Sequence, residues 1–379
     1  MKRVCLLILF VLVSRNALAN DQNNTLQLTL PPTIYAVPGV ETSLYFDNIV
    51  LTQTPEDYRF QVDCPLGTTH AQRWMVTPTA EDVGQKTLQI TVSDRDGQQL
   101  ATASTQLQIV PRDAGAGEKR RLLIIGDSLT HATIYPNELH RLLSQDENPK
   151  VTFLGTHKPE RANEGVAHEG YGGWTWQRFA TKYEPNPDGT YRKRSSPFVY
   201  LGEDKKPILD VARFFREECD NDPPDFVIVM LGINDCFSAP PDDSQGIDDR
   251  IDLVFAQAET LLTAIQKAAP QAKIGICLTT PPNSRQAAFE ANYQDRYTRW
   301  GWKRIQHHLV QRQLEQFGRQ QDRNRFLIPT ELDLDPVDGY PANNGVHPNE
   351  TGYHQIARTM YAWLKWRLSE NQSSTKGTP

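Results

Sequence analysis

Ser128 occupies the position in this 379-residue chain that points most directly to chemistry. It belongs to the turn Gly-Asp-Ser-Leu at 126–129, which follows the apolar run 122–125. In open α/β sheets, ligands bind at the turn after a buried strand, and the N–H groups that begin the next helix favour developing negative charge. The Ser128 hydroxyl is therefore a candidate nucleophile, although a polar turn after a buried strand is more often only a turn.

Three further segments supply hydrogen-bond donors and a base. The loop 168–175 is dense in glycine, and Asn234 follows a second buried-strand pattern at 226–231. His347 lies shortly before a helical pattern at 353–368. A nucleophile, a flexible loop with free N–H groups, an asparagine amide and a histidine are together the parts needed for acyl transfer.

The order of these residues resembles that of the SGNH (GDSL-type) hydrolase superfamily, and the resemblance covers about residues 119–368. It implies that Ser128 is the nucleophile and His347 the general base. It also implies an oxyanion hole made of the Ser128 backbone N–H, a glycine N–H from the 168–175 loop, and the Asn234 side chain. Gly173 is the expected glycine, with Gly172 as the alternative, because one sequence leaves the register open there.

The chain departs from the family pattern at the residue that orients the base. The family has Asp three residues before the histidine, and this chain has Asn344. In another serine hydrolase, changing the triad Asp to Asn costs about 10⁴ in rate by fixing the wrong tautomer. Either a Ser–His dyad works alone, or a backbone carbonyl, the Asn344 side-chain oxygen or Asp338 holds the ring. The ordinary role of Asp338, in an Asp-Gly turn, is an exposed carboxylate.

Two other pairs of residues lie close to these segments. Asp127 and Asp235 follow the two strands and are expected to brace the turns through backbone N–H groups. Trp174 and Trp176 either stack on a sugar ring or pack within the loop. No cofactor is expected, and no metal site, because the chain has no C-x-x-C pair.

Strand and helix patterns alternate from residue 121 onward, which predicts a parallel sheet with helices on both faces. The expected domain is a flavodoxin-like three-layer α/β/α fold with five strands, interrupted by an insertion at 181–207. Its strands are expected at 121–125, 151–155, 226–231, 273–278 and 326–329, and its helices near 133–144, 248–268, 286–318 and 353–368.

The preceding part of the chain follows a period of two. Segments 86–92 and 103–110 alternate on either side of an Asp-Gly turn, which predicts an antiparallel hairpin. With short strand patterns at 26–30, 43–46 and 59–62, this indicates a small all-β immunoglobulin-like sandwich. The module either binds carbohydrate or packs on the next domain, and the lack of a cluster of exposed aromatic residues favours packing.

The predicted boundaries follow from these patterns and from the N-terminus. Lys2 and Arg3, the apolar run 4–13 and an Ala-Leu-Ala site predict a signal peptide cleaved near Ala19, hence a secreted or periplasmic protein. The run is short for a bilayer span, and an uncleaved anchor is the lesser alternative. The expected parts are a signal peptide at 1–19, a β-sandwich at 20–111, a linker at 112–118, a hydrolase domain at 119–370 and a flexible tail at 371–379.

The net charge limits the possible binding partners, and the cysteine content limits the possible disulfide bonds. A formal net charge of −6 argues against nucleic acid and anionic membranes. After cleavage, Cys64, Cys219, Cys236 and Cys277 allow three disulfide pairings, although small buried thiols are the commoner state. No pattern indicates the oligomeric state.

These features predict a secreted serine esterase that hydrolyses carboxylic esters through an acyl-enzyme. Export, the tryptophan loop and the β module favour an acylated carbohydrate, either a small molecule or a polysaccharide. A lipase or lysophospholipase is the alternative, and the lack of an apolar stretch near the motifs counts against it. A non-catalytic carbohydrate-binding protein with this fold is a further alternative, against which the intact Ser128, Asn234 and His347 argue.

Overall fold

The computed structural model describes residues 26–185, 195–318 and 324–375. The predicted signal peptide and residues 186–194 of the predicted insertion lie outside the described residues. No helix among the described residues is both long enough and apolar enough to cross a membrane.

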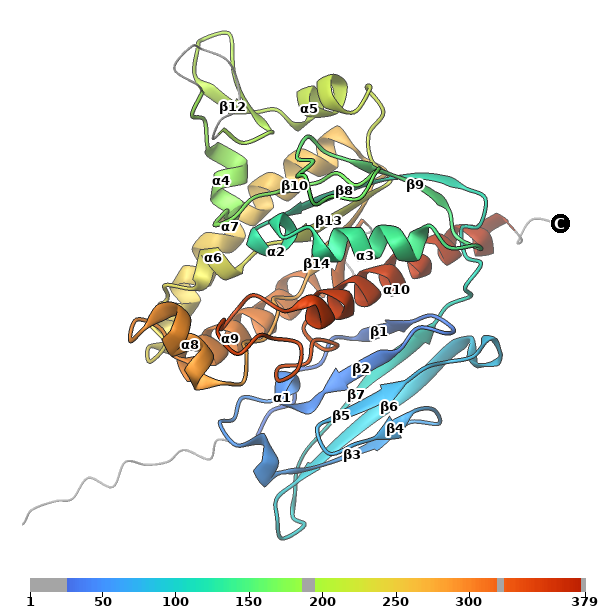
Figure 1. Ribbon diagram of the computed structural model, residues 1–379, viewed down its shortest axis with the longest axis vertical. Helices are drawn as coiled ribbons and strands as arrows, with labels where there is room; N and C mark the ends of the chain where they lie inside the picture. Colours follow the sequence, from blue (N-terminus) through green and yellow to red (C-terminus); the bar gives the residue numbers. More distant parts are fainter. Residues whose placement is uncertain (1–25, 186–194, 319–323, 376–379) are drawn as a thin grey trace, which may run out of the picture.

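A parallel sheet forms the centre of the larger domain (Figure 1). Two short strands pair with β8 one after the other along its length. β9 pairs with residues 119–123 of β8, and β10 pairs with residues 125–126. Together they count as one strand of the sheet. The sheet then continues through β13, β14 and β15, which confirms the predicted five-stranded parallel sheet. The strands are β8 (Lys119–Gly126), β9 (Lys150–Leu154), β10 (Glu169–Gly170), β13 (Phe226–Met230), β14 (Lys273–Cys277) and β15 (Arg325–Ile328).

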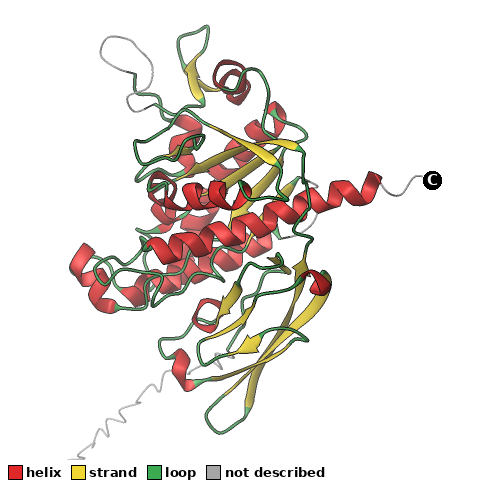
Figure 2. Ribbon diagram, turned by 45° about the vertical axis from the view of Figure 1, so that its right-hand side comes forward, coloured by secondary structure: helices red, strands yellow, loops and turns green. Residues whose placement is uncertain are grey.

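The two central strands are buried on both faces, as a parallel sheet covered by helices requires. α3 (Ile134–Leu143) and α10 (Glu350–Thr375) lie side by side on one face (Figures 1 and 2). α5 (Val211–Glu218), α7 (Ser244–Ala268) and α9 (Arg299–Phe317) pack in a row on the other. α10 runs to Thr375, past the predicted domain end at 370.

Two details differ from the expected elements. The helix expected at 286–318 is divided into α8 (Gln286–Tyr293) and α9. The first helix ends before Gln294, whose φ is +54°. Thr298 then caps the N-terminus of α9 by accepting the Gly301 N–H at 3.0 Å. The described part of the insertion carries a small hairpin of β11 (Val199–Leu201) and β12 (Pro207–Leu209).

The N-terminal region contains two small sheets with one shared apolar core. The hairpin of β6 and β7 is antiparallel, as predicted. The immunoglobulin-like sandwich itself stays a prediction. One sheet has the order β1-β7-β6-β3 and the other β2-β5-β4. Their bounds are β1 (Thr33–Ala36), β2 (Thr42–Tyr45), β3 (Arg59–Asp63), β4 (Thr68–Thr69), β5 (Arg73–Val76), β6 (Gly84–Ser93) and β7 (Gln99–Ile109).

The strand expected at 26–30 does not form. Thr29 lies against α9 instead, where its hydroxyl is 3.0 Å from His307 Nε2 and accepts from Gln311 at 3.2 Å. These contacts direct the segment to the second domain rather than to a sheet partner.

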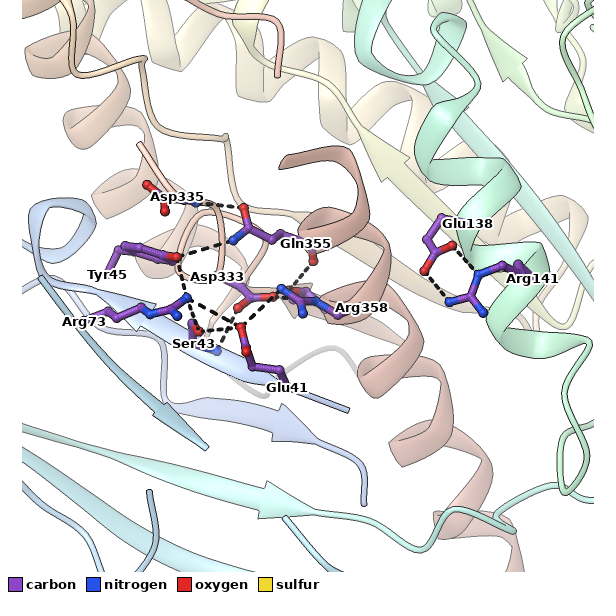
Figure 3. A network of polar contacts seen from close by, with 11 residues as sticks. Glu41, Ser43, Tyr45, Arg73, Glu138, Arg141, Asp333, Asp335, Gln355 and Arg358 are labelled. Carbon is purple, nitrogen blue, oxygen red and sulfur yellow. Dashed lines mark hydrogen bonds and ion pairs between the residues drawn. The ribbon is translucent and has the colours of Figure 1, made fainter. Parts of the chain in front are cut away.

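Buried polar contacts join the two regions (Figure 3). The Ser43 N–H donates to Asp333 Oδ1 at 2.7 Å. Arg358 on α10 lies 3.7 Å from Asp333 and 3.6 Å from Glu41. Burial raises the pKa of Asp333 to about 7, against the opposing effect of Arg358.

The segment between β15 and α10 is held by the β region at several points. Asn48, in the short helix α1 (Phe46–Ile49), donates its amide to the carbonyls of Glu331 and Leu334 at 2.7 and 2.9 Å. Leu332 enters the apolar core of the β region. The chain that leads to His347 is therefore anchored on the neighbouring sheets.

An ion pair made by one buried lysine, and the bonds of a second buried lysine, complete the junction. Lys303 on α9 pairs with Asp47 at 2.7 Å, and only 2% of its side chain is exposed. In the segment 112–118, predicted as a linker, Ala114 is buried and its carbonyl accepts from Lys365 at 2.6 Å. This segment is packed against α10.

Candidate active site

Ser128 is the first residue of α2 (Ser128–His131), directly after β8. Asp127 caps this helix by accepting the Leu129 N–H at 3.0 Å. Gly126 is required before it, because a Cβ there would lie 1.8 Å from the Thr130 hydroxyl oxygen. The half-buried Ser128 hydroxyl lies 2.9 Å from His347 Nε2, although 219 residues separate the two in sequence.

The orientation of His347 is set by Asn344. The Asn344 Oδ1 lies 3.1 Å from His347 Nδ1 and also accepts the backbone N–H groups of Val346 and His347, at 3.1 and 2.9 Å. Two backbone donors require an acceptor, so the atom facing the ring is the oxygen and not the amide nitrogen. Nδ1 therefore carries the proton, and Nε2 is free to accept from Ser128. Burial lowers the pKa of His347, which favours the neutral ring.

Asp338 is not brought to the histidine. Its side chain is 83% exposed, and its carboxylate lies 3.9 Å from Arg285. Its backbone bonds to Asp335 and Asn349. Of the candidates for orienting the ring, only the Asn344 oxygen is shown in contact with His347 Nδ1 among the described residues.

Asn234 lies at the turn after β13. Gly232 makes this turn with φ of +135°, a conformation that a residue with a Cβ rarely adopts, and α6 (Ile233–Cys236) follows. The Asn234 amide donates to Asp127 Oδ2 at 3.3 Å and to the Trp174 carbonyl at 3.1 Å. The asparagine thus lies between the serine turn and the glycine loop.

The two candidate glycines differ in conformation. Gly173 has φ of +75°, whereas Gly172 is not among the glycines with positive φ. Both are exposed, and the Gly173 carbonyl accepts from Arg178 at 2.5 Å. Of the two, Gly173 is the one whose backbone requires glycine.

The glycine loop is fixed beside the serine by residues that sequence reasoning left unassigned. Gly170 pairs with Gly126 across β10 and β8, and the Tyr171 N–H donates to the Gly126 carbonyl at 3.0 Å. His168 Nδ1 accepts the Gly170 N–H at 3.0 Å, and burial lowers the pKa of His168 to about 3. The position of His168 next to the glycine run was the only signal for this role.

Asn283 supports the base loop from the other side. Its amide donates to the carbonyls of Pro341 and Asn344, at 2.8 and 3.0 Å, and its own N–H donates to the Gly345 carbonyl at 2.9 Å. In the sequence, an asparagine after two prolines is typical of an ordinary turn. Nothing in the sequence therefore indicated that Asn283 supports the loop that carries the base.

The two aspartates expected to brace the turns are both buried. Burial raises the pKa of Asp127 and that of Asp235 to about 7, and the nearby Asp235 raises that of Asp127 further. Asp127 braces its own turn, whereas Asp235 accepts the Trp176 N–H at 3.1 Å and so holds the start of α4 (Trp176–Thr181).

The tryptophans belong to the packing of the loop. Trp176 is buried, which rules out its suggested stacking on a sugar. Trp174 is half-buried, with its ring centroid 4.7 Å from that of Tyr171 and 4.8 Å from that of Phe179.

Within the described ranges, no group of three or more His, Cys, Asp or Glu side chains is arranged to hold a metal ion. The four cysteines outside the predicted signal peptide are unpaired in this structure, and three of them are buried.

Ser128 and Asn234 lie at the carboxyl ends of two parallel strands, and His347 contacts Ser128 from the loop before α10. This combination of fold and side chains is that of an α/β hydrolytic enzyme. Residues 124–355 match the model of the GDSL-like lipase/acylhydrolase family, and the chain belongs to that family. Membership places it among the ester hydrolases.

No curated protein matches the chain. Among solved structures, it is similar to a family 3 carbohydrate esterase from Talaromyces cellulolyticus, with 16% identity and a TM-score of 0.41, over 66% of this chain and 99% of that one. It is also similar to a family 3 carbohydrate esterase from Clostridium thermocellum, with 17% identity and a TM-score of 0.41, over 67% of this chain and 98% of that one.

Proposed function

We propose that the protein is a serine esterase in which Ser128 is acylated and His347 acts as general base. The observation that carries this proposal is the 2.9 Å contact between the Ser128 hydroxyl and Nε2 of His347, whose pKa is lowered by burial. His347 takes the hydroxyl proton as Ser128 Oγ bonds to the ester carbonyl carbon. The tetrahedral intermediate then collapses, and the alcohol leaves with the proton from His347.

Water completes the cycle by the same steps. His347 removes a proton from water, whose oxygen bonds to the acyl carbon. When this second intermediate collapses, Ser128 Oγ leaves and recovers its proton from His347, so the acid is released and the enzyme is restored.

The negative charge on the carbonyl oxygen is met by three donors: the backbone N–H groups of Ser128 and Gly173, and the Asn234 amide. In the free protein this amide donates to two oxygens, of which Asp127 Oδ2 is the more distant at 3.3 Å. The developing oxyanion takes the place of this longer contact. Asp127 holds the serine turn, and Asp235 holds the start of α4 directly after the glycine loop.

Asn344 is a positioning residue in this mechanism. It fixes the productive tautomer of His347 as a carboxylate would, but it brings no charge to stabilise the imidazolium. The wrong-tautomer penalty known for Asn in another serine hydrolase does not apply, because here the amide oxygen, not the NH₂ group, faces the ring.

The proposed substrate is an acylated carbohydrate outside the cytoplasm. Support comes from the predicted signal peptide and the attached β region, while the tryptophan loop no longer adds to it. The alternative is a lipase or lysophospholipase. Against that alternative, the large apolar side chains exposed among the described residues are few: Leu51, Val83, Leu201, Ile208 and Leu253.

An organophosphonate that labels Ser128 stoichiometrically would separate an esterase from a non-catalytic protein of the same fold. Ser128→Ala should abolish both labelling and hydrolysis of para-nitrophenyl acetate, with an unchanged melting temperature because the side chain is only half-buried. More than trace activity in this variant would remove Ser128 as nucleophile. Para-nitrophenyl esters of rising chain length, measured beside acetylated xylan and pectin, would separate an acetyl esterase from a lipase.

A further inference from the structure

A cleft of about 710 Å³ lies between the β region and the hydrolase domain, and neither Ser128 nor His347 lines it. One wall is formed by α1, by residues 53–58 and the start of β3, and by residues 70–72 of the β region. The other wall is formed by Ser284, Arg299, Pro336 and Val337. The size is that of a small-molecule site, which in proteins occurs preferentially where two domains meet.

The lining combines aromatic rings with polar side chains that have no protein partner. Phe60 and Tyr58 are half-buried in the cleft, and the ring of Phe60 stacks on that of Phe46 at 4.5 Å with planes 2° apart. The side chains of Gln53 and Gln72 make no hydrogen bond within the described residues, although both line the cleft. Rings that cover apolar faces and amides that bond hydroxyl groups suit a sugar.

The charges of the lining cancel. Asp47 and Arg299, both in the lining, have opposite signs and lie 3.6 Å apart. Lys303, which also pairs with Asp47 at 2.7 Å, is not part of the lining. The two other charged side chains of the lining, Glu56 and Arg59, have opposite signs. A cleft without net charge favours a neutral ligand over an acidic one.

The cleft shares a wall with the loop that carries the base. The Ser284 N–H donates to the Pro336 carbonyl at 2.7 Å, and both residues line the cleft. The adjacent residue, Asn283, holds the Asn344 carbonyl at 3.0 Å. Figure 1 shows α1 beneath the loop that leads into α10, at the end of the sheet where α2 and α6 lie. The cleft therefore adjoins the segment that leads to the base.

We propose that this cleft binds a neutral oligosaccharide stretch of the polymer whose ester groups are cleaved at Ser128. The proposal rests on the esterase function proposed above and assigns the β region a role in substrate binding in addition to packing. The ion pair between Asp47 and Lys303 and the bonds of Asn48 hold the two walls together, so the cleft is formed before the ligand arrives.

Two variants of the full chain test the cleft without touching the catalytic centre. Tyr58→Ala removes a ring, and Ala71→Trp fills the cleft from an exposed position. Gln85→Trp, an exposed site at the opposite end of β6 from the strand end that pairs with Arg59, is the matched control. For each protein, kcat and KM would be measured on acetylated xylan and acetylated glucomannan and, separately, on para-nitrophenyl acetate.

We expect the KM for the better polymer to rise about 3- to 10-fold in both cleft variants. Turnover of para-nitrophenyl acetate should stay within about twofold of wild type in all three, since no changed residue touches the site. Parallel changes on both kinds of substrate, or no change on the polymer, would overturn the proposal.

Binding without turnover separates this proposal from the esterase function. Ser128→Ala protein would be run through gels containing deacetylated xylan, glucomannan, mixed-linkage β-glucan or polygalacturonate. Retardation by a neutral polysaccharide that Ala71→Trp abolishes supports the cleft even if no ester is cleaved. Retardation by polygalacturonate alone, or by none of the four, rejects the cleft even if Ser128 proves to be the nucleophile.

Discussion

Replacing Asn344 with aspartate tests the arrangement around the base. In the wild-type protein a neutral oxygen lies 3.1 Å from Nδ1 of His347, and burial lowers the pKa of the ring. Asn344→Asp places a negative charge at that distance, and an opposite charge this close shifts a pKa by about 1–3 units. Because both residues are partly exposed to solvent, we expect His347 to gain about 1–2 units.

The expected gain in rate follows from that shift. One pKa unit is about 1.4 kcal/mol, so the imidazolium formed in the transition state gains about 1.4–2.7 kcal/mol, and kcat rises by at most about 10- to 100-fold. This expected rise in kcat is far smaller than the loss of about 10⁴ in rate that is seen when an Asn fixes the wrong tautomer of the histidine. Here two backbone N–H groups already hold the Asn344 oxygen toward the ring.

The assay is the pH dependence of kcat/KM for para-nitrophenyl acetate. In Asn344→Asp the acidic limb should move upward by about 1–2 pH units, while activity above the limb is retained or increased. Asp338→Asn is the control and should be nearly silent, since Asp338 is exposed and lies by Arg285. A large loss in Asp338→Asn, with no shift in Asn344→Asp, would show that Asp338 orients the base. A gain near 10⁴ in Asn344→Asp would show that the wild-type ring has the wrong tautomer.

Three further outcomes follow from the same structure. Asn234→Ala should lower kcat by about 10²–10³ with little change in KM, and a pure KM effect would assign Asn234 to substrate binding instead. The acidic limb of the wild-type profile should lie below the ordinary histidine pKa of about 6.5, because burial lowers the pKa of His347 and the neutral ring is the base; a limb above 6.5 would contradict this. Lys303→Met should cost about 1.5–3 kcal/mol in denaturant unfolding by removing the nearer of the two cations that face the half-buried Asp47, since Arg299 at 3.6 Å remains, and Lys303→Met/Asp47→Asn should recover part of that loss.

The sheet could be predicted from the sequence because it depends on local patterns, whereas the pair Ser128–His347, 219 residues apart, was expected only from the resemblance in the order of the motifs. The apolar runs 122–125 and 226–230 are typical of strands covered on both faces, and parallel strands bring their carboxyl ends to one edge. The single long helix at 286–318 was wrong because no proline or glycine marks its break. Gln294 adopts φ of +54° there, and Thr298 caps the second half.

What the sequence could not show are contacts that depend on the packing of distant segments. Asn283 and His168 hold the base loop and the glycine loop through backbone groups, and such bonds leave no periodic signal. The junction between the two regions is of the same kind. Asn48, in a one-turn helix of the β region, bonds to carbonyls 283 and 286 residues further along the chain.

Two features keep the pKa of His347 lower than in a full triad: the ring is buried, and Asn344 stands where the family has Asp. Burial disfavours the imidazolium, and a neutral oxygen at Nδ1 does not restore what a carboxylate would contribute. The base therefore stays unprotonated to lower pH than in a full triad, while each proton transfer in the transition state receives less stabilisation. The Asn344 oxygen maintains the orientation and the tautomer of the His347 ring. Compared with a full triad, the site therefore lacks only the negative charge of a carboxylate.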